Sequence, residues 1–222
     1  MMMTRKTLLS ALFGTGMLAA LFLPVLPARA IEATPVALTT QTPDTQAATN
    51  VIKNFYAELT DSMRRADTLG YAGRYKKMQT AVHTAFDMPT MTRLATGLAW
   101  TNATPDEQTQ LISAFESFSA ASYASQFNAY DGEQFALGDT KPMNGGLMVE
   151  TTLQPKEGDA VALNYMMRRD AAGSWRIVDV FLNGTISQLA TRRAEFSAIA
   201  HKDGIAALVN SLGEKSKQMG PS

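Results

Sequence analysis

The sequence predicts an α+β domain in which helices pack on one face of a curved antiparallel four-stranded sheet and enclose an apolar cavity. Apolar residues recur at helical spacing from Ala47 to Tyr130. The period then changes to two between Glu133 and Asn183, and helical spacing returns after Thr185. Short connections between the predicted strands favour antiparallel pairing.

The first thirty residues have the pattern of a secretory signal peptide. Arg5 and Lys6 precede an apolar run from Leu8 to Leu26, and Ala28-Arg29-Ala30 places small residues two apart. We expect cleavage of residues 1–30 before Ile31 and export to the periplasm. An uncleaved inner-membrane anchor is the alternative, since the apolar run approaches the roughly 20 residues that span a bilayer.

The rest of the chain is expected to form one domain. Residues 31–46 are rich in Thr, Pro, Gln and Ala, and we expect a flexible leader because they carry little large apolar surface. Residues 47–213 are predicted to form the folded domain, and residues 214–222 a polar tail.

The composition excludes several classes of function. After removal of the signal peptide the chain has 17 basic and 20 acidic residues, so its net charge is near −3, which argues against a nucleic-acid partner. The chain has no cysteine, which excludes disulfides, thiol catalysis, cysteine-based zinc or iron–sulfur sites and a lipidated cysteine anchor. The fold must therefore be held by its core.

The helical part contains clear start and stop signals. The first helix is expected from Ala47 to Gly70 and the second from Tyr71 to Phe86. Asp87 is predicted to cap a short helix that runs through Trp100. The segment Thr104-Pro105-Asp106-Glu107 is a capping box that begins a long helix with a wide aromatic face.

Four strands and two more helices follow. The predicted turns lie at Asn144-Gly145-Gly146, Glu157-Gly158-Asp159 and between Asp170 and Ser174. The strands are expected at Glu133 to Asp139, Leu147 to Gln154, Ala160 to Arg169 and Trp175 to Asn183. The last helices are expected at Thr185 to Ala200 and Asp203 to Leu212, with Gly213 as the stop signal.

Polar residues that could support catalysis are few. His83 and Asp87 are one helical turn apart and could form an acid–base pair, but a capping role for Asp87 is the favoured interpretation. His201, near a helix end with Asp203, fits the same structural role. No third histidine accompanies them, no serine stands in a nucleophile elbow, and no glycine motif cradles a phosphate. We expect neither a metal nor a cofactor.

An ordered series of short motifs resembles the MlaC family of toluene-tolerance or phospholipid-binding periplasmic proteins. The series covers about Ala47 to Leu212 and includes Phe86-Asp87-Met88, Met91, Leu94-Ala95, Gly97-Leu98, Trp100, Glu107-Gln108, Val149, Tyr165, Trp175-Arg176-Ile177-Val178-Asp179-Val180, Gly184, Arg193, Phe196, Gly204 and Leu208. The segment from Ser187 to Arg193 departs from the usual family pattern and is similar to the hopanoid-associated branch, HpnM.

The resemblance implies a lipid shuttle between an inner-membrane ABC transporter complex and an outer-membrane acceptor. The ligand would be a phospholipid or a hopanoid, held in the apolar cavity without a catalytic group. A small hydrolase or isomerase that uses the same cavity, with His83 and Asp87 as its acid–base pair, is the alternative.

The expected lipid contacts come from the inward faces of both layers. The candidate lining residues are Phe86, Met91, Leu94, Leu98, Trp100, Phe115, Phe118, Tyr123, Phe127, Tyr165 and Ile177. Ordinary core packing is the competing interpretation for each of them. Arg193 is the candidate for a head-group contact. The basic cluster Arg64, Arg65, Arg74, Lys76 and Lys77 is a candidate docking face for a partner or for transient contact with a membrane surface.

Overall fold

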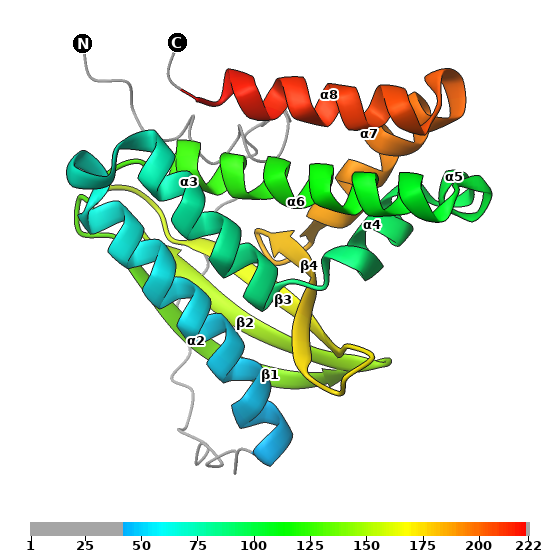
Figure 1. Cartoon of the computed structure of the whole chain (residues 1–222). Helices are drawn as coiled ribbons and strands as arrows, with labels where there is room; N and C mark the ends of the chain where they lie inside the picture. The colour runs from blue at the N-terminus through cyan, green and yellow to red at the C-terminus, as the bar shows by residue number, and fades with distance from the viewer. Residues whose placement is uncertain (1–41, 221–222) are drawn as a thin grey trace, which may run out of the picture.

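The computed structural model describes residues 42–220, which form an open antiparallel sheet covered by helices on one face (Figure 1). The helices are α2 (Pro43–Arg64), α3 (Ala66–Ala85), α4 (Met88–Thr96), α5 (Leu98–Asn102), α6 (Pro105–Gln126), α7 (Gln188–Asp203) and α8 (Ile205–Gln218). The strands are β1 (Gln134–Met143), β2 (Gly146–Gln154), β3 (Val161–Arg169), β4 (Trp175–Leu182) and β5 (Ile186–Ser187). The α+β class and the antiparallel sheet are confirmed, with a fifth short strand added.

The sheet follows the order of the chain, β1-β2-β3-β4-β5, and every neighbouring pair is antiparallel. Alternation decides which face is covered, because successive side chains on a strand point to opposite faces. On β2 the buried side chains are Leu147, Val149, Thr151 and Leu153. Tyr165 and Met167 of β3 and Ile177 of β4 continue the same apolar face, so the core lies between the sheet and the helices.

Two hydrogen bonds fasten α2 across the inner face of the sheet. Tyr56 Oη and Thr151 Oγ1 are 2.6 Å apart, and Thr49 Oγ1 lies 3.2 Å from Thr140 Oγ1. Burial raises the pKa of Tyr56 to about 12, which keeps the phenol protonated. A buried hydroxyl needs a partner, and these pairs supply it at the positions where α2 crosses β1 and β2.

The chain begins its first helix earlier than the sequence predicts. Thr42 caps α2 by accepting from Thr45 N at 3.3 Å, and Pro43 occupies the first helical position, where its missing N–H costs nothing. Residues 43–46, predicted as part of the flexible leader, are therefore helical. The rest of the leader and the predicted signal peptide lie outside the described residues.

The other differences in helix bounds lie at Arg65, Gly70 and Gly97. The first helix ends at Arg64, and Gly70 (φ 59°) forms a kink inside α3 where the sequence predicted a helix end. Gly97 (φ 59°) divides the predicted helix after Asp87 into α4 and α5. Both positions require backbone conformations that side chains with a Cβ rarely adopt.

The C-terminal part differs in three places. The first strand extends to Met143 rather than ending at Asp139, and Ile186 and Ser187 pair with β4, so that α7 starts at Gln188 and not at Thr185. The predicted stop at Gly213 is wrong, because α8 continues through it to Gln218. Gly204 (φ 86°) separates α7 from α8. Residues 214–218 of the predicted polar tail are helical.

The predicted caps are confirmed. Thr104 and Glu107 form both hydrogen bonds of the capping box at the start of α6, and Asp87 accepts from Thr90 N at 3.0 Å at the start of α4. None of the helices within residues 42–220 is long and apolar enough to cross a membrane.

Two glycine substitutions test the helix bounds at the C-terminus. Gly213→Ala should raise the free energy of unfolding by about 0.5–1 kcal/mol, because alanine loses less chain entropy than glycine inside a helix, and a Cβ at Gly213 meets no atom within 4 Å. Gly204→Ala should lower it by about 1–3 kcal/mol, because φ 86° and ψ 171° are accessible almost only to glycine. Urea denaturation measures both, and destabilisation by Gly213→Ala would argue against a continuous α8.

Candidate ligand-binding site

A narrow apolar slot opens where α6, α7 and β4 come together. Its volume is about 60 Å³, and its wall consists of Phe86, Met91, Phe115, Phe118, Ser119, Ser122, Tyr123, Asp179, Val180, Gln188, Leu189 and Arg192. Apolar side chains form most of this wall, and the polar ones come mainly from α6 and the start of α7.

Each element places its residues in the slot for a local reason. Phe115, Phe118 and Ser122 lie on one face of α6 because they are three and four residues apart. The junction between α3 and α4 reaches the slot because Asp87 N donates to the carbonyl oxygen of Ile177 on β4, at 2.9 Å. This bond fixes Phe86 beside the sheet, with Met91 one turn further on.

Aromatic rings form the inner end of the slot. The ring centroids of Phe86 and Tyr123 are 6.1 Å apart, and both rings pack against Phe55 of α2, at 5.2 and 5.1 Å. Burial raises the pKa of Tyr123, so its hydroxyl group stays neutral. On the α7 side, Phe115 and Phe196 make an edge-to-face pair at 5.0 Å, a favoured geometry for aromatic rings.

Asp179 fixes the start of α7 at the edge of the slot. Its carboxylate accepts from Ser187 Oγ at 2.5 Å, from Leu189 N at 3.0 Å and from Val180 N at 2.7 Å. Burial raises the pKa of this carboxyl group, although the donated hydrogen bonds act in the opposite direction. The same residue therefore joins β4 to the first turn of α7.

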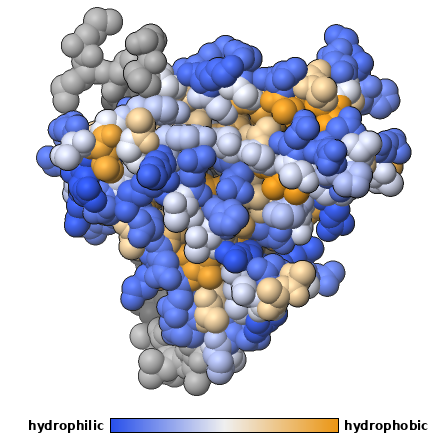
Figure 2. All heavy atoms as spheres, viewed as in Figure 1, coloured by the Kyte–Doolittle hydropathy of each residue, from blue (hydrophilic) through white to orange (hydrophobic). Residues whose placement is uncertain are grey.

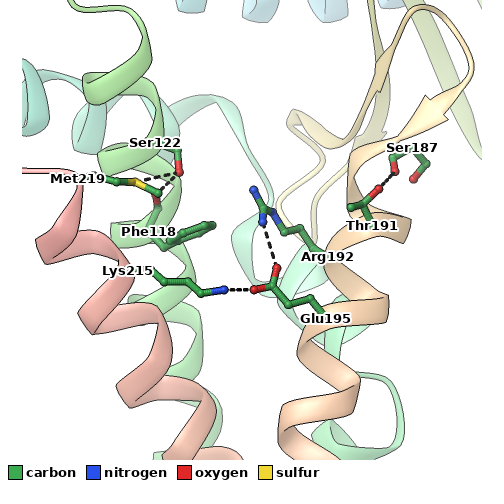
Figure 3. A network of polar contacts seen from close by, with 8 residues as sticks. All are labelled: Phe118, Ser122, Ser187, Thr191, Arg192, Glu195, Lys215 and Met219. Carbon is green, nitrogen blue, oxygen red and sulfur yellow. Dashed lines mark hydrogen bonds and ion pairs between the residues drawn. The ribbon is translucent and has the colours of Figure 1, made fainter. Parts of the chain in front are cut away.

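A chain of charged groups connects α7 to α8 beside the slot (Figure 3). Arg192 Nη1 donates to Glu195 Oε2 at 3.2 Å, and Glu195 also pairs with Lys215 of α8. The guanidinium group of Arg192 lies 4.9 Å from the centroid of the Phe118 ring on α6. Burial lowers the pKa of Arg192, while Glu195 acts to raise it. The network spans α6, α7 and α8 at one side of the slot.

The structure brings five of the predicted lining residues together in the slot, namely Phe86, Met91, Phe115, Phe118 and Tyr123. Three more belong to the surrounding core. The ring centroid of Phe127 lies 6.0 Å from that of Tyr123, and the ring centroid of Tyr165 on β3 lies 5.8 Å from that of Tyr56. Ile177 on β4 is fully buried. Leu94 is partly buried against the core, and Trp100 is half-buried.

Two predicted residues lie away from the slot. The side chain of Leu98 is 85 % exposed. Arg193 is also exposed, and together with Leu98 and His201 it borders an open groove of about 760 Å³ between α5 and the junction of α7 and α8. The face of the molecule shown in Figure 2 is mainly hydrophilic, with separate hydrophobic patches.

The sequence interpretation missed the polar part of the slot. Asp179, Gln188 and Arg192 were not among the predicted site residues, although Asp179 lies in a motif that carried the family resemblance. Arg192 and Arg193 are neighbours, and only the rotation of α7 about its axis shows which of them faces the slot. That rotation is set by the contact of Asp179 on β4 with Leu189 N in the first turn of α7, which the helical spacing of α7 does not reveal.

The alternative acid–base pair of His83 and Asp87 does not form, and the favoured capping role of Asp87 is confirmed. His83 Nδ1 lies 3.1 Å from Glu116 Oε1 on α6, and its side chain is 77 % exposed, while Asp87 caps α4. Within residues 42–220, no group of three or more potential metal ligands is found. The basic cluster is divided: Lys77 pairs with Glu58 and Asp61, whereas Arg74 donates to backbone carbonyl groups.

An apolar slot between a helical layer and an open sheet is the kind of site that binding proteins for apolar or amphipathic ligands use. The family model described as "MlaC protein" matches residues 53–214, which is most of the chain. The chain therefore belongs to the MlaC family, as the motif series indicated. The family and the shape of the site point to a binding protein rather than an enzyme.

Comparison with solved structures supports the fold. A phospholipid-binding protein from Ralstonia solanacearum, solved in complex with a phospholipid, aligns with a TM-score of 0.64 and 23 % sequence identity. The alignment covers 78 % of this chain and 98 % of that protein. None of the curated proteins compared with the chain matches it.

The raised pKa of Asp179 predicts a pH dependence of stability. Between the ordinary pKa, near 3.9, and the raised value, the folded protein binds more protons than the unfolded chain. The stabilisation that the protonated Asp179 contributes to the fold is therefore complete below a pH of about 4. It is lost as the pH rises through the folded pKa. The asparagine of Asp179→Asn cannot ionise, so the variant should show no such pH dependence. As the pH rises from about 4 through the folded pKa of Asp179, the free energy of unfolding of the wild type should fall relative to that of the variant. Urea midpoints measured from acidic to neutral pH would reveal it, and parallel curves would contradict it.

Proposed function

We propose that this protein is a periplasmic lipid carrier that binds a phospholipid or a hopanoid and works with an ABC transporter complex between the inner and outer membranes. The observation that supports this proposal most strongly is the apolar slot between α6, α7 and β4 in a chain of the MlaC family. The phospholipid bound in the similarly folded Ralstonia solanacearum protein supports this class of ligand.

The physical need for such a carrier is large. Burial of one methylene group is worth about 0.8 kcal/mol, so a lipid with roughly thirty methylenes would lose on the order of 20 kcal/mol on crossing water unprotected. A carrier has to offer an apolar environment comparable with the bilayer and leave the polar head group near water. The phenylalanine and methionine side chains of the slot suit a lipid tail once the slot has widened. Asp179, Gln188 and Arg192 supply polar groups for the head group.

The slot must widen to receive a lipid tail. Its volume of about 60 Å³ is small beside the roughly 300–1,000 Å³ of ligand pockets. The backbones of α6 and α7 stay apart, and α8 packs against both of them. A shift of α7 relative to α6 would enlarge the slot toward Tyr165 and Ile177 on the sheet, while the pairing of β1 to β4 stays intact. We propose that the tail then contacts these two residues together with the five predicted residues of the slot.

The alternative of a hydrolase or isomerase receives no support from the geometry. His83 is paired with Glu116 at the surface rather than with Asp87, and neither His83 nor Asp87 lines the slot. We therefore propose binding and release of the lipid without a chemical step.

Native mass spectrometry tests the carrier function directly. Protein purified from its own periplasm should carry one or more amphiphiles that organic extraction releases and identifies. His83→Ala should retain the bound lipid, because the histidine does not contact the slot. A ligand-free mass that stays unchanged after incubation with phospholipid vesicles would refute the proposed function.

A larger side chain inside the slot should weaken lipid binding. Ser119 lies in the wall of the slot, and Ser119→Leu should weaken lipid binding at least tenfold because the added carbon atoms occupy the space of the tail. The matched control is Ser113→Leu on the exposed side of the same helix, which should bind as wild type does. Lipid transfer from fluorescent vesicles measures the effect, with circular dichroism as the check on folding. Equal binding by both variants would place the ligand elsewhere.

A further inference from the structure

A cationic side chain forms part of the apolar slot. Arg192 extends from the second turn of α7, its side chain is only 19 % exposed, and it shares the slot wall with Phe115 and Phe118. Arginine is tolerated in such surroundings because its planar group stacks on aromatic faces, as it does here on Phe118. A guanidinium group at this position needs an anionic partner, since a buried charge without one is unstable.

Glu195 provides that partner but is shared between two cations. It binds Arg192 from within α7 and Lys215 from α8 (Figure 3). If Arg192 turned to another anion, Glu195 would remain neutralised by Lys215, so the exchange leaves no unpaired carboxylate. The pairing of Arg192 with Glu195 is therefore replaceable at low cost, unlike an isolated buried ion pair.

The other polar groups of the slot hold hydrogen bonds within the fold. The carboxylate of Asp179 accepts from the hydroxyl group of Ser187 and from two backbone N–H groups, and Ser122 Oγ donates to the carbonyl oxygen of Phe118 at 2.8 Å. Arg192 is the group in the slot wall whose chemistry suits a phosphate or carboxylate, because guanidinium groups bind both with two parallel hydrogen bonds.

We propose that Arg192 is a specificity-determining residue that leaves Glu195 and binds the anionic group, phosphate or carboxylate, of an amphiphile whose tail fills the slot. This inference rests on the proposed carrier function. Arg192 would select amphiphiles with an anionic head group over neutral lipids, and the neutral lipids include ring-fused lipids without an anionic group.

A matched pair of fluorescent probes tests the selection. cis-Parinaric acid and its methyl ester have the same tail and differ only in the anionic group, and both gain fluorescence in an apolar site. Wild-type protein should bind the acid about tenfold more tightly than the ester, as expected for a charge-assisted hydrogen bond in a partly buried site. Inorganic phosphate at millimolar concentration should not displace the acid, because the anion is held only together with its tail.

Variants assign the preference to one residue. Arg192→Met keeps an apolar stem beside Phe118 and should lose the preference, so that the acid and the ester bind with equal affinity. Glu195→Gln removes the carboxylate that pairs with Arg192 and should tighten binding of the acid several-fold without changing that of the ester. Lys202→Met, on the exposed side of α7, is the matched control for the loss of one positive charge. Circular dichroism confirms that each variant is folded.

The outcomes separate this inference from the carrier function. If neither probe binds wild-type protein, the carrier function itself fails. If both bind equally, or if phosphate displaces the acid, the protein binds lipids but Arg192 does not select them. Loss of the preference in Arg193→Met instead of Arg192→Met would also overturn the proposal, because it would place the head group in the exposed groove.

Discussion

The position of β4 between two helical segments is the constraint on which the site depends. On the edge of β4 opposite β3, the carbonyl oxygen of Ile177 accepts from Asp87 N, and Asp179 accepts from Leu189 N in the first turn of α7. The strand thus sets both walls of the slot, since Phe86 and Met91 follow from the first bond and Leu189 and Arg192 from the second. A displacement of β4 would move both walls at once.

Around this strand, the molecule combines a firm layer with an adjustable one. The sheet is continuous through four long strands, and α2 is fastened to it by buried hydroxyl pairs. In contrast, α7 meets α6 through side chains, with Phe196 packed on Phe115 and Arg192 on Phe118. Side-chain contacts can rearrange without loss of backbone hydrogen bonds, so the slot can widen while the sheet remains intact.

The aromatic and the charged residues of the slot come from different elements. Phe86, Tyr123 and Phe55 provide an apolar interior, whereas Asp179, Gln188 and Arg192 come from β4 and the start of α7. This separation matches an amphiphile, which has one apolar and one polar end.

The sequence by itself determined the kinds and order of the elements, the helix caps at Thr104 and Asp87, the family, and most of the apolar residues, because hydrophobic period and capping are local properties of the chain. Only the tertiary structure decided which residues meet in the slot. Arg192 and Arg193 differ by a rotation of about 100° on the same helix, and the contact between Asp179 of β4 and the start of α7 decides which of them faces inward. The extension of α8 through Gly213 was likewise decided by packing on α6 and α7, which outweighs the weak helix preference of glycine.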